Sequence, residues 1–497
     1  MSDLRIGWAC RDISTTRPVK LAGQFHVRVS KGIAEPIYAT ALALDSGDDY
    51  VIFVSLDLIS IGNYIVDDVR AAVTRRMPEI DPLKITFNAT HTHTAPSTYK
   101  ESAITLSQPN TGIEIAPNSE YRDYLIPLVA DAICSAWENR SEGQIGYGYG
   151  YAVVAHSRRV IYFDDVSKRP DAKDKSGLAV DGHGVMYGNT DDPNFSHYEA
   201  GADHFINLLF TFDPAGKLTG AVVNIPCPSQ NSEMEYKISA DYWADVRQAI
   251  RAKHGDIFIL PQCAAAGDLS PRILHYKAAE ARRFSLKYGD RAENYERAAR
   301  KDIAERVAAA FDEVLDWAKL DLRSSAPITH ITETVDLDRR WVTEEEYALA
   351  TNTLEALKDV AYETEGADPE ELARRNSILT TRRNRSNRIL EKWEAQQSVG
   401  TFDIELHVVR VGDIAFATNP FELYMDYQHR IQARSPFEQT FIVQMSPRPG
   451  EGGGAYLPTE RGLSNCGYSA SLYDNRVSPK GGQQLVDRTV ELLKQIK

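Results

Sequence analysis

The sequence has few cysteines, no long apolar run and no excess of basic residues. Its five cysteines are scattered over 497 residues without a Cys-x-x-Cys pair, which argues against a disulfide framework and favours a reducing compartment. No stretch reaches the roughly 20 apolar residues that a membrane-spanning helix needs. The formal net charge is −14, which disfavours nucleic acid and anionic membranes as partners.

The N-terminal residues also lack the pattern of a secretory leader. Residues 1–15 read MSDLRIGWACRDIST, with no basic segment followed by an apolar one. We therefore expect a cytoplasmic protein that acts on a small molecule. The composition leaves a homo-oligomer open.

Alternating strand and helix patterns fill the first third of the chain. Short apolar runs at 38–44 and 51–56 predict strands, and apolar residues at helical spacing predict a helix over 63–77. A further strand is expected at 85–88 and an amphipathic helix at 121–137. This order predicts a sheet that is covered by helices.

The remaining chain continues in the same way. Strands are expected at 205–212, 218–225, 257–260, 402–411 and 414–418, and helices at 240–254, 291–319 and 483–497. We interpret the polar segment 164–202 as a long functional loop or lid, because such loops are otherwise uncommon in compact domains. The fold class is therefore α/β of the α+β type, one domain over 1–497 with a large mixed sheet flanked by helices.

Two further helices are expected as an insert between residues 340 and 400. Thr343 precedes Glu346 by the three residues of a capping box, and Asp368 with Pro369 forms an N-cap followed by a first-turn proline. We expect a helical hairpin. Its second arm carries the basic run RRNRSNR at 382–388, which we interpret as a solvated helix face.

Two histidines one residue apart follow the strand predicted at 85–88. They are His91 and His93 of KITFNATHTHTAPSTY, and alternate residues of an extended chain point to one side. Both imidazoles would then face one pocket at a strand end, where ligand sites of α/β sheets collect. A zinc ion would use such a pair. Two histidines hydrogen-bonded in a loop are the alternative.

Five segments in this order resemble the neutral ceramidase family. THTHTAP at 90–96 resembles the family's THTHSGP, and VIFVSLDLIS before it places Asp57 at the family's aspartate. AAAGDLSPR resembles the GDxSPN stretch, NPFELYMDY the PGE-F strand end, and GAYLPTERGLSNCGY the tyrosine-bearing loop. Together these segments span most of the chain.

The resemblance implies a zinc site. His91, Glu422 and Tyr456 fall on three zinc ligands of the family. The family's second zinc histidine is absent, because this chain reads VVNIPCPSQN and our alignment places Cys227 there. A thiolate is a good zinc ligand, so we predict zinc on His91, Cys227, Glu422 and Tyr456. A buried structural cysteine with a lost or weakened metal site is the alternative.

The resemblance also implies catalytic residues. His93 falls on the histidine that contacts the substrate oxyanion, and Arg158 or Arg159 of HSRRV on the arginine that assists it; we favour Arg158. Ser270 falls on the catalytic serine and Tyr468 on a second active-site tyrosine. A serine in a turn such as GDLSP is more often a cap, so the role of Ser270 depends on the resemblance.

The expected function is metal-dependent hydrolysis of an amide-type bond. A zinc-bound water would attack the carbonyl, with His93, Arg158 and Tyr468 at the oxyanion. Ceramidases continue into a C-terminal immunoglobulin-like domain, which we expect to be absent because the sequence ends at Lys497. That end, the missing leader and the polar segment 164–204 favour a small polar substrate over ceramide.

Two other functions are compatible with the sequence. A carbohydrate-active enzyme, either a glycosidase or a lyase, would use the same scaffold, because a fold does not fix a function. Release of a free amine would indicate the amidase, and new reducing ends would indicate sugar cleavage. A non-catalytic binding protein would hold no metal, and substitution of His91 would change only its stability.

Overall fold

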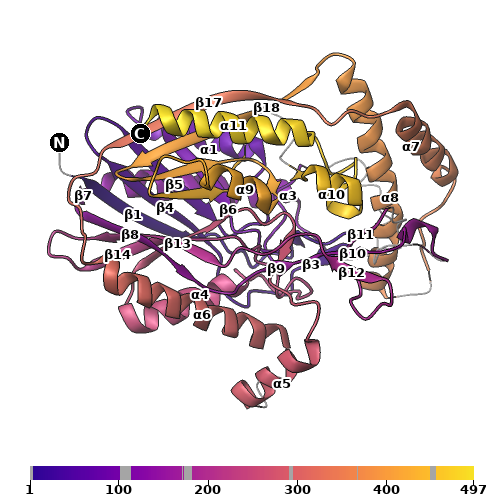
Figure 1. The fold of residues 1–497 in the computed structure, drawn as a ribbon, viewed down its shortest axis with the longest axis horizontal. Coiled ribbons are helices and arrows are strands. Elements are labelled where there is room, and N and C mark those ends of the chain that lie inside the picture. Colours follow the sequence, from indigo (N-terminus) through magenta and orange to yellow (C-terminus); the bar gives the residue numbers. More distant parts are fainter. Residues whose placement is uncertain are drawn as a thin grey trace.

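Three β-sheets form the centre of the molecule, and helices cover them on the outside (Figure 1). The computed structural model describes residues 4–100, 114–170, 172, 182–289, 295–365, 368–447 and 455–497. The fold class is α/β of the α+β type, as the sequence predicts. In this part of the chain, no helix is both long enough and apolar enough to cross a bilayer.

The first sheet has the strand order β6-β5-β4-β1-β7. Its members are β1 (Arg5–Asp12), β4 (Tyr38–Asp45), β5 (Tyr50–Leu56), β6 (Ile85–Ala89) and β7 (Ser141–Glu142). The parallel strands β5 and β6 are joined through α1 (Asn63–Arg76), which packs on α3 (Asn118–Glu138), and η1 (Pro82–Lys84) leads into β6. The predicted elements of the first third are confirmed.

The second sheet has the order β15-β14-β13-β8. It contains β8 (Gln144–Tyr151), β13 (Phe205–Phe212), β14 (Leu218–Ile225) and β15 (Phe258–Cys263). The predicted hairpin is β13 and β14, and β14 is parallel to β15. α4 (Tyr242–His254) packs on α6 (Tyr295–Ala318), while α5 (Lys277–Tyr288) was not predicted. Residues 291–294 of the helix expected at 291–319 lie outside the described residues.

The third sheet has the order β17-β18-β19-β21. It contains β17 (Ile328–Asp338), β18 (Thr401–Val411), β19 (Ile414–Thr418) and β21 (Gln439–Val443), with β19 parallel to β21. α9 (Met425–Gln432) and α11 (Pro479–Gln495) pack against each other, and α11 lies on β17 and β18. Apolar side chains of all three sheets share one core, in which the ring of Phe416 lies 4.6 Å from that of Phe53.

The segment predicted as a long loop contains two strands. β10 (Arg159–Tyr162) lies between β11 (Gly184–Met186) and β12 (Phe195–Tyr198) in a small sheet, and η2 (Val166–Lys168) follows β10. Residue 171 and residues 173–181 lie outside the described part. The loop prediction was therefore wrong for the described residues around β11 and β12, where pairing with β10 supplies backbone partners that a loop would lack.

The predicted insert is a helical hairpin of α7 (Glu344–Leu357) and α8 (Pro369–Gln396). Thr343 and Glu346 form the expected capping box, and Asp368 caps α8. The basic run of α8 is not a solvated face throughout: Arg385 is buried, and its guanidinium lies over the rings of Phe25, Tyr468 and Tyr473. The prediction was wrong for Arg385, because aromatic rings from distant segments cover its side chain, whereas Arg382 and Arg388 are exposed as expected.

Three short pairings complete the fold around the site. β2 (Lys20–Leu21) pairs with β3 (Arg28–Val29), and β9 (His156–Ser157) pairs with β16 (Leu269–Ser270). β20 (Glu422–Leu423) runs parallel to β22 (Tyr456–Leu457), which is followed by α10 (Glu460–Asn465) and η4 (Tyr468–Ala470).

Each of the three sheets contributes one parallel strand pair, and the chain leaves these pairs toward one region. His91 and His93 follow β6, the loop that contains Glu233 follows β14, and Glu422 follows β19. The carboxyl ends of parallel strands are where ligand sites collect. The topology therefore brings segments more than a hundred residues apart to one place.

Candidate active site

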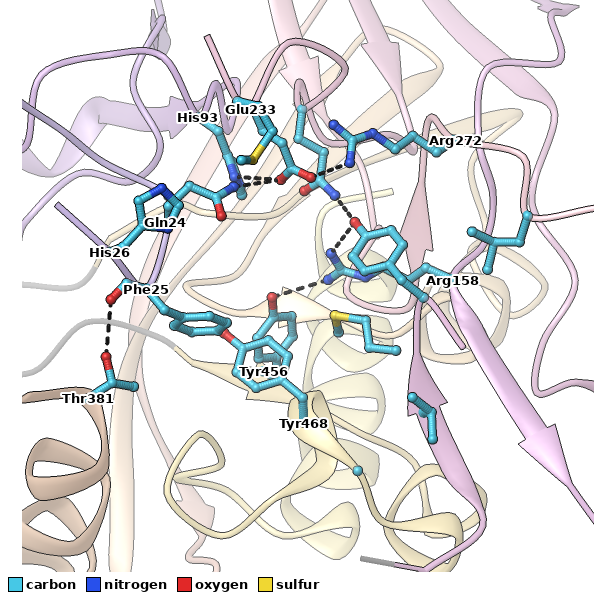
Figure 2. Close-up of a pocket in the computed structure, with 18 of the residues that line it drawn as sticks. Gln24, Phe25, His26, His93, Arg158, Glu233, Arg272, Thr381, Tyr456 and Tyr468 are labelled. Carbon is cyan, nitrogen blue, oxygen red and sulfur yellow. Dashed lines mark hydrogen bonds and ion pairs between the residues drawn. The ribbon is translucent and has the colours of Figure 1, made fainter. Parts of the chain in front are cut away.

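A large cavity lies at the carboxyl ends of these strand pairs (Figure 2). Its volume is about 1290 Å³. Its polar lining includes Gln24, His93, Arg158, Gln230, Glu233, Arg272, Tyr456 and Tyr468, and α8 contributes Arg374, Ile378 and Thr381. The helical insert thus forms part of the wall, although no motif in the sequence places it at the site.

The two histidines of the HTH motif lie side by side, but not on an extended chain. His91 has a φ of 63°, in the left-handed region that non-glycine residues seldom adopt. Its Nδ1 lies 2.8 Å from the carbonyl of Ile59, and its Nε2 lies 3.3 Å from Nε2 of His93. Burial lowers the pKa of His91 to about 4, so this imidazole is neutral at neutral pH.

Glu422 and Tyr456 reach the same place from the third sheet. They are register partners in the parallel pair of β20 and β22. The Oε2 atom of Glu422 lies 3.4 Å from Nε2 of His91. Burial raises the pKa of Tyr456 well above its ordinary value, so its phenol is protonated.

The two consecutive arginines of HSRRV have different surroundings. Arg158 lines the cavity, and its Nη2 donates to the hydroxyl of Tyr456 at 3.1 Å and lies 3.7 Å from Oε2 of Glu422. Arg159 points elsewhere and forms a wholly buried ion pair with Glu199, with an Nε–Oε2 distance of 2.6 Å. Arg158 is therefore the arginine that faces the predicted catalytic groups.

Cys227 does not line the cavity. Its Sγ is wholly buried and contacts the carbonyls of Pro228 at 3.5 Å and Val154 at 3.8 Å. Burial raises the pKa of this thiol well above its ordinary value, which keeps it protonated. From the same loop, Gln230 and Glu233 face the cavity instead.

Ser270 is likewise wholly buried and does not line the cavity. Its hydroxyl accepts a hydrogen bond from the backbone N–H of Arg272 at 3.2 Å. This contact is that of a turn cap, the alternative that the sequence left open. Its effect on the site is to shape the turn from which Arg272 enters the cavity.

Tyr468 lies on the opposite wall from Glu233 (Figure 2). Its ring lies edge-on to those of Tyr456, at 5.6 Å, and Phe25, at 5.1 Å. The guanidinium of Arg385 in α8 covers it from behind at 5.4 Å. The insert therefore supports the tyrosine that the resemblance identified.

Sequence reasoning missed four polar side chains of this cavity. Glu233 contacts His93 and Arg272, Gln24 donates to Glu233, and Gln230 contacts Tyr187. No motif marks these residues. The one available signal for Glu233 was its place in the loop after a buried strand, next to the segment that carries Cys227.

Comparison with known proteins gives structural matches alone. No protein-family model and no curated protein match the chain. A solved structure of neutral ceramidase from Pseudomonas aeruginosa superposes with a TM-score of 0.66 at 17% identity, covering 100% of this chain and 75% of that one. The chain has a neutral ceramidase-like fold. A ceramidase complexed with C2 gives a TM-score of 0.65 at 15% identity, with coverages of 100% and 76%.

The neutral ceramidase-like fold raises the question of whether these side chains suit zinc. Because the Ile59 carbonyl can only accept, Nδ1 of His91 donates to it, and Nε2 presents a lone pair to the Glu422 carboxylate at 3.4 Å. Two facing acceptors favour a cation near them. Within the described residues, no three His, Cys, Asp or Glu side chains form a group that could hold a metal. His91 and Glu422 thus form a pair of donors, and a zinc ion between them would need a third protein ligand such as the Tyr456 hydroxyl beside them.

Proposed function

We propose that the chain is a hydrolase that cleaves an amide-type bond in a small polar substrate. The observation that carries this proposal is the meeting of His93, Arg158, Tyr456 and Tyr468 in one cavity of a neutral ceramidase-like fold. Two solved structures that share this fold are ceramidases, and a ceramide is an amide. The polar groups at one end of the cavity suit a polar part of the substrate, and apolar side chains such as Met234, Leu274 and Ile378 line other parts of it.

The proposed cofactor is zinc, held by His91, Glu422 and Tyr456. Three protein ligands and an open position are typical of catalytic zinc sites. Zinc bound there would lower the pKa of its water toward neutrality and so supply a nucleophile. We leave Cys227 out of this set, because its Sγ points to the carbonyls of Pro228 and Val154.

Arg158 is the group that would stabilise the oxyanion. Its guanidinium is buried and held in place by the carbonyl of Gly267 at 2.8 Å and the hydroxyl of Tyr456 at 3.1 Å. A fixed cation in a site that excludes water stabilises developing negative charge without reorganisation. The Tyr468 hydroxyl adds a donor on the other wall, to which α8 also contributes side chains.

The test is a panel of N-acyl compounds, comprising N-acyl amino acids, disaccharides of N-acyl amino sugars and a short-chain ceramide, incubated with the purified chain with and without added zinc. Free amine is measured with an amine-reactive dye and new reducing ends with a colorimetric assay. We expect amine from a polar member, and a loss of about 100-fold or more in Arg158→Gln. Reducing ends without amine would identify a carbohydrate-active enzyme, and neither product from any member would contradict the proposal.

A further inference from the structure

One face of α8 contacts two separate segments of the cavity wall. Ser377, Thr381 and Arg385 follow one another at intervals of four residues, so they lie on the same face of the helix. The hydroxyl of Ser377 accepts from the backbone N–H of Val27 at 3.1 Å, and that of Thr381 donates to the carbonyl of Phe25 at 3.1 Å (Figure 2). The insert therefore holds the backbone of the first segment, from which Phe25 enters the cavity.

The second segment, residues 468–475, is held by a lysine of the same helix. The side chain of Lys392 is buried, and its Nζ donates to the carbonyls of Leu472 and, at 2.7 Å, Asn475. The amide of Asn475 in turn donates to the carbonyl of Tyr456 at 3.2 Å. The backbone of this segment is thus connected both to the insert and to the proposed metal ligand Tyr456.

The side chain of Arg385 lies against both segments at once. It is 8% exposed, and its guanidinium carbon lies 4.9 Å from the ring centre of Phe25, 5.4 Å from that of Tyr468 and 4.4 Å from that of Tyr473. All three rings line the cavity, whereas Arg385 does not. A cation removed from water in this way attracts ring faces strongly. The positions of three wall residues therefore depend on one side chain behind them.

This support matters most for Tyr468. A hydrogen-bond donor stabilises an oxyanion best when it is held in place before the reaction. The ring of Tyr468 contacts those of Phe25 and Tyr456 edge-on and the guanidinium of Arg385. Because Arg385 contacts both Tyr468 and Phe25, its loss would loosen the ring of Tyr468 on two sides.

We propose that Arg385 is a positioning residue that holds the Tyr468 hydroxyl at the reaction centre, which makes the helical insert part of the catalytic site. This inference rests on the proposed hydrolase function, in which that hydroxyl donates to the oxyanion. The planar guanidinium suits the position because it can lie over several rings, which a lysine ammonium does less well. Arg385 acts only through the rings, so its effect on turnover must disappear when the hydroxyl is absent.

The first experiment is a double-mutant cycle with Arg385→Met, Tyr468→Phe and the double variant, assayed with the best N-acyl substrate of the panel. We expect kcat to fall about 100-fold in Tyr468→Phe and about 10- to 30-fold in Arg385→Met. The double variant should be no slower than Tyr468→Phe alone, because both changes remove the same donor. Effects that multiply in the double variant would overturn the inference.

Two further variants separate the cation from a general effect on the helix. Arg385→Lys keeps the charge, so its kcat should lie between those of the wild type and Arg385→Met. Arg382→Met removes an exposed arginine of the same helix that does not line the cavity, and it should retain wild-type kinetics. Arg385→Lys as slow as Arg385→Met, or an equal fall in Arg382→Met, would contradict the inference.

The last experiment needs no substrate. The full-length protein is labelled with ¹³C in its tyrosine rings, and the signals of Tyr468 are identified by their loss in Tyr468→Phe. We expect these signals to shift and the ring to flip faster in Arg385→Met, or to a smaller extent in Arg385→Lys if Arg385→Met does not fold, with no change in Arg382→Met. Unchanged Tyr468 signals without Arg385 would overturn the inference. If no substrate is turned over, the proposed function fails, whereas this spectrum still decides whether Arg385 positions Tyr468.

Discussion

The molecule contains two buried groups of the same composition, a pair of histidines with a glutamate and an arginine. The cavity cluster consists of His93 and Arg158, which line the cavity, with His91 and Glu422, which contact them. Its histidine nitrogens lie 3.3 Å apart, and Oε2 of Glu422 lies 3.4 Å from the neutral imidazole of His91 and 3.7 Å from the guanidinium of Arg158. These long contacts leave polar atoms of the cluster available to bind a ligand.

The sealed cluster consists of His330, His407, Glu405 and Arg70, between α1 and the strands β17 and β18. Nε2 of His330 lies 2.9 Å from Nδ1 of His407, whose Nε2 lies 2.8 Å from Glu405. Arg70 binds both oxygens of Glu405, at 2.7 and 3.0 Å. None of the four lines the cavity.

The difference between the clusters shows that residue type alone does not identify a site. Glu405 has a bidentate arginine and a histidine, and an ion pair satisfied in this way contributes to stability when intact. Arg158 instead donates hydrogen bonds to the carbonyl of Gly267 and the hydroxyl of Tyr456, and its side chain also lines the cavity. We therefore assign catalysis to the cavity cluster and stability to the sealed cluster.

The largest effect on stability is expected for Arg70→Ala. Removal of the arginine leaves Glu405 buried without its partner, which typically costs about 3 to 5 kcal/mol. Urea unfolding should show this loss, while kcat per folded molecule stays at the wild-type value. A large fall in kcat in the folded fraction would contradict the assignment of the sealed cluster to stability.

Arg158→Lys is the matching change in the cavity cluster. Lysine keeps the charge but loses the planar fork that contacts Gly267 and Tyr456. We expect kcat to fall by roughly 100-fold, about 2.7 kcal/mol of transition-state stabilisation, with a smaller loss of stability than in Arg70→Ala. The comparison fails if Arg158→Lys unfolds the protein and leaves turnover of the folded molecules intact.

The sealed cluster should also make stability depend on pH. Burial lowers the pKa of His330 well below its ordinary value of 6.5 and also lowers that of His407. The unfolded chain takes up protons as the pH falls through about 6.5, whereas the folded chain does not, so stability is full above that pH and decreases below it. His330→Gln should flatten this dependence by up to about 1.4 kcal/mol per pH unit. Identical slopes in urea unfolding would contradict the prediction.

The smallest effect is expected for Ser270→Ala. Its hydroxyl accepts one hydrogen bond from the backbone of Arg272, which is worth about 0.5 to 1.5 kcal/mol. Turnover should change by no more than about twofold, since the hydroxyl does not line the cavity. A fall in kcat similar to that of Arg158→Lys would instead support the catalytic role that the resemblance implies for this serine.

Most of the sheet and helix pattern follows from local sequence, because a buried strand or helix face repeats at its own period. The helix caps at Thr343 and Asp368 could also be predicted, since each depends on residues within three positions in the sequence. The left-handed φ of His91 could not be predicted, because the surrounding segments impose this conformation.

The candidate site was predictable only where a motif marked it. His91 and His93 carry a visible spacing, whereas Glu233 is placed in the cavity by contacts with residues 39 to 209 positions away, Gln24 among them. The prediction that Arg385 is solvent-exposed was wrong for the same reason, since the rings that cover it belong to other segments. Such contacts exist only after the sheets assemble.

The measurement that tests the account most directly is zinc content by elemental analysis after zinc addition and removal of excess metal. The account predicts about one zinc per chain in the wild type, in Cys227→Ala and in His330→Gln of the sealed cluster, and none in His91→Ala. Loss of zinc in Cys227→Ala would restore the thiol to the ligand set. No zinc in the wild type would contradict the assignment of the cavity cluster as a metal-dependent catalytic centre.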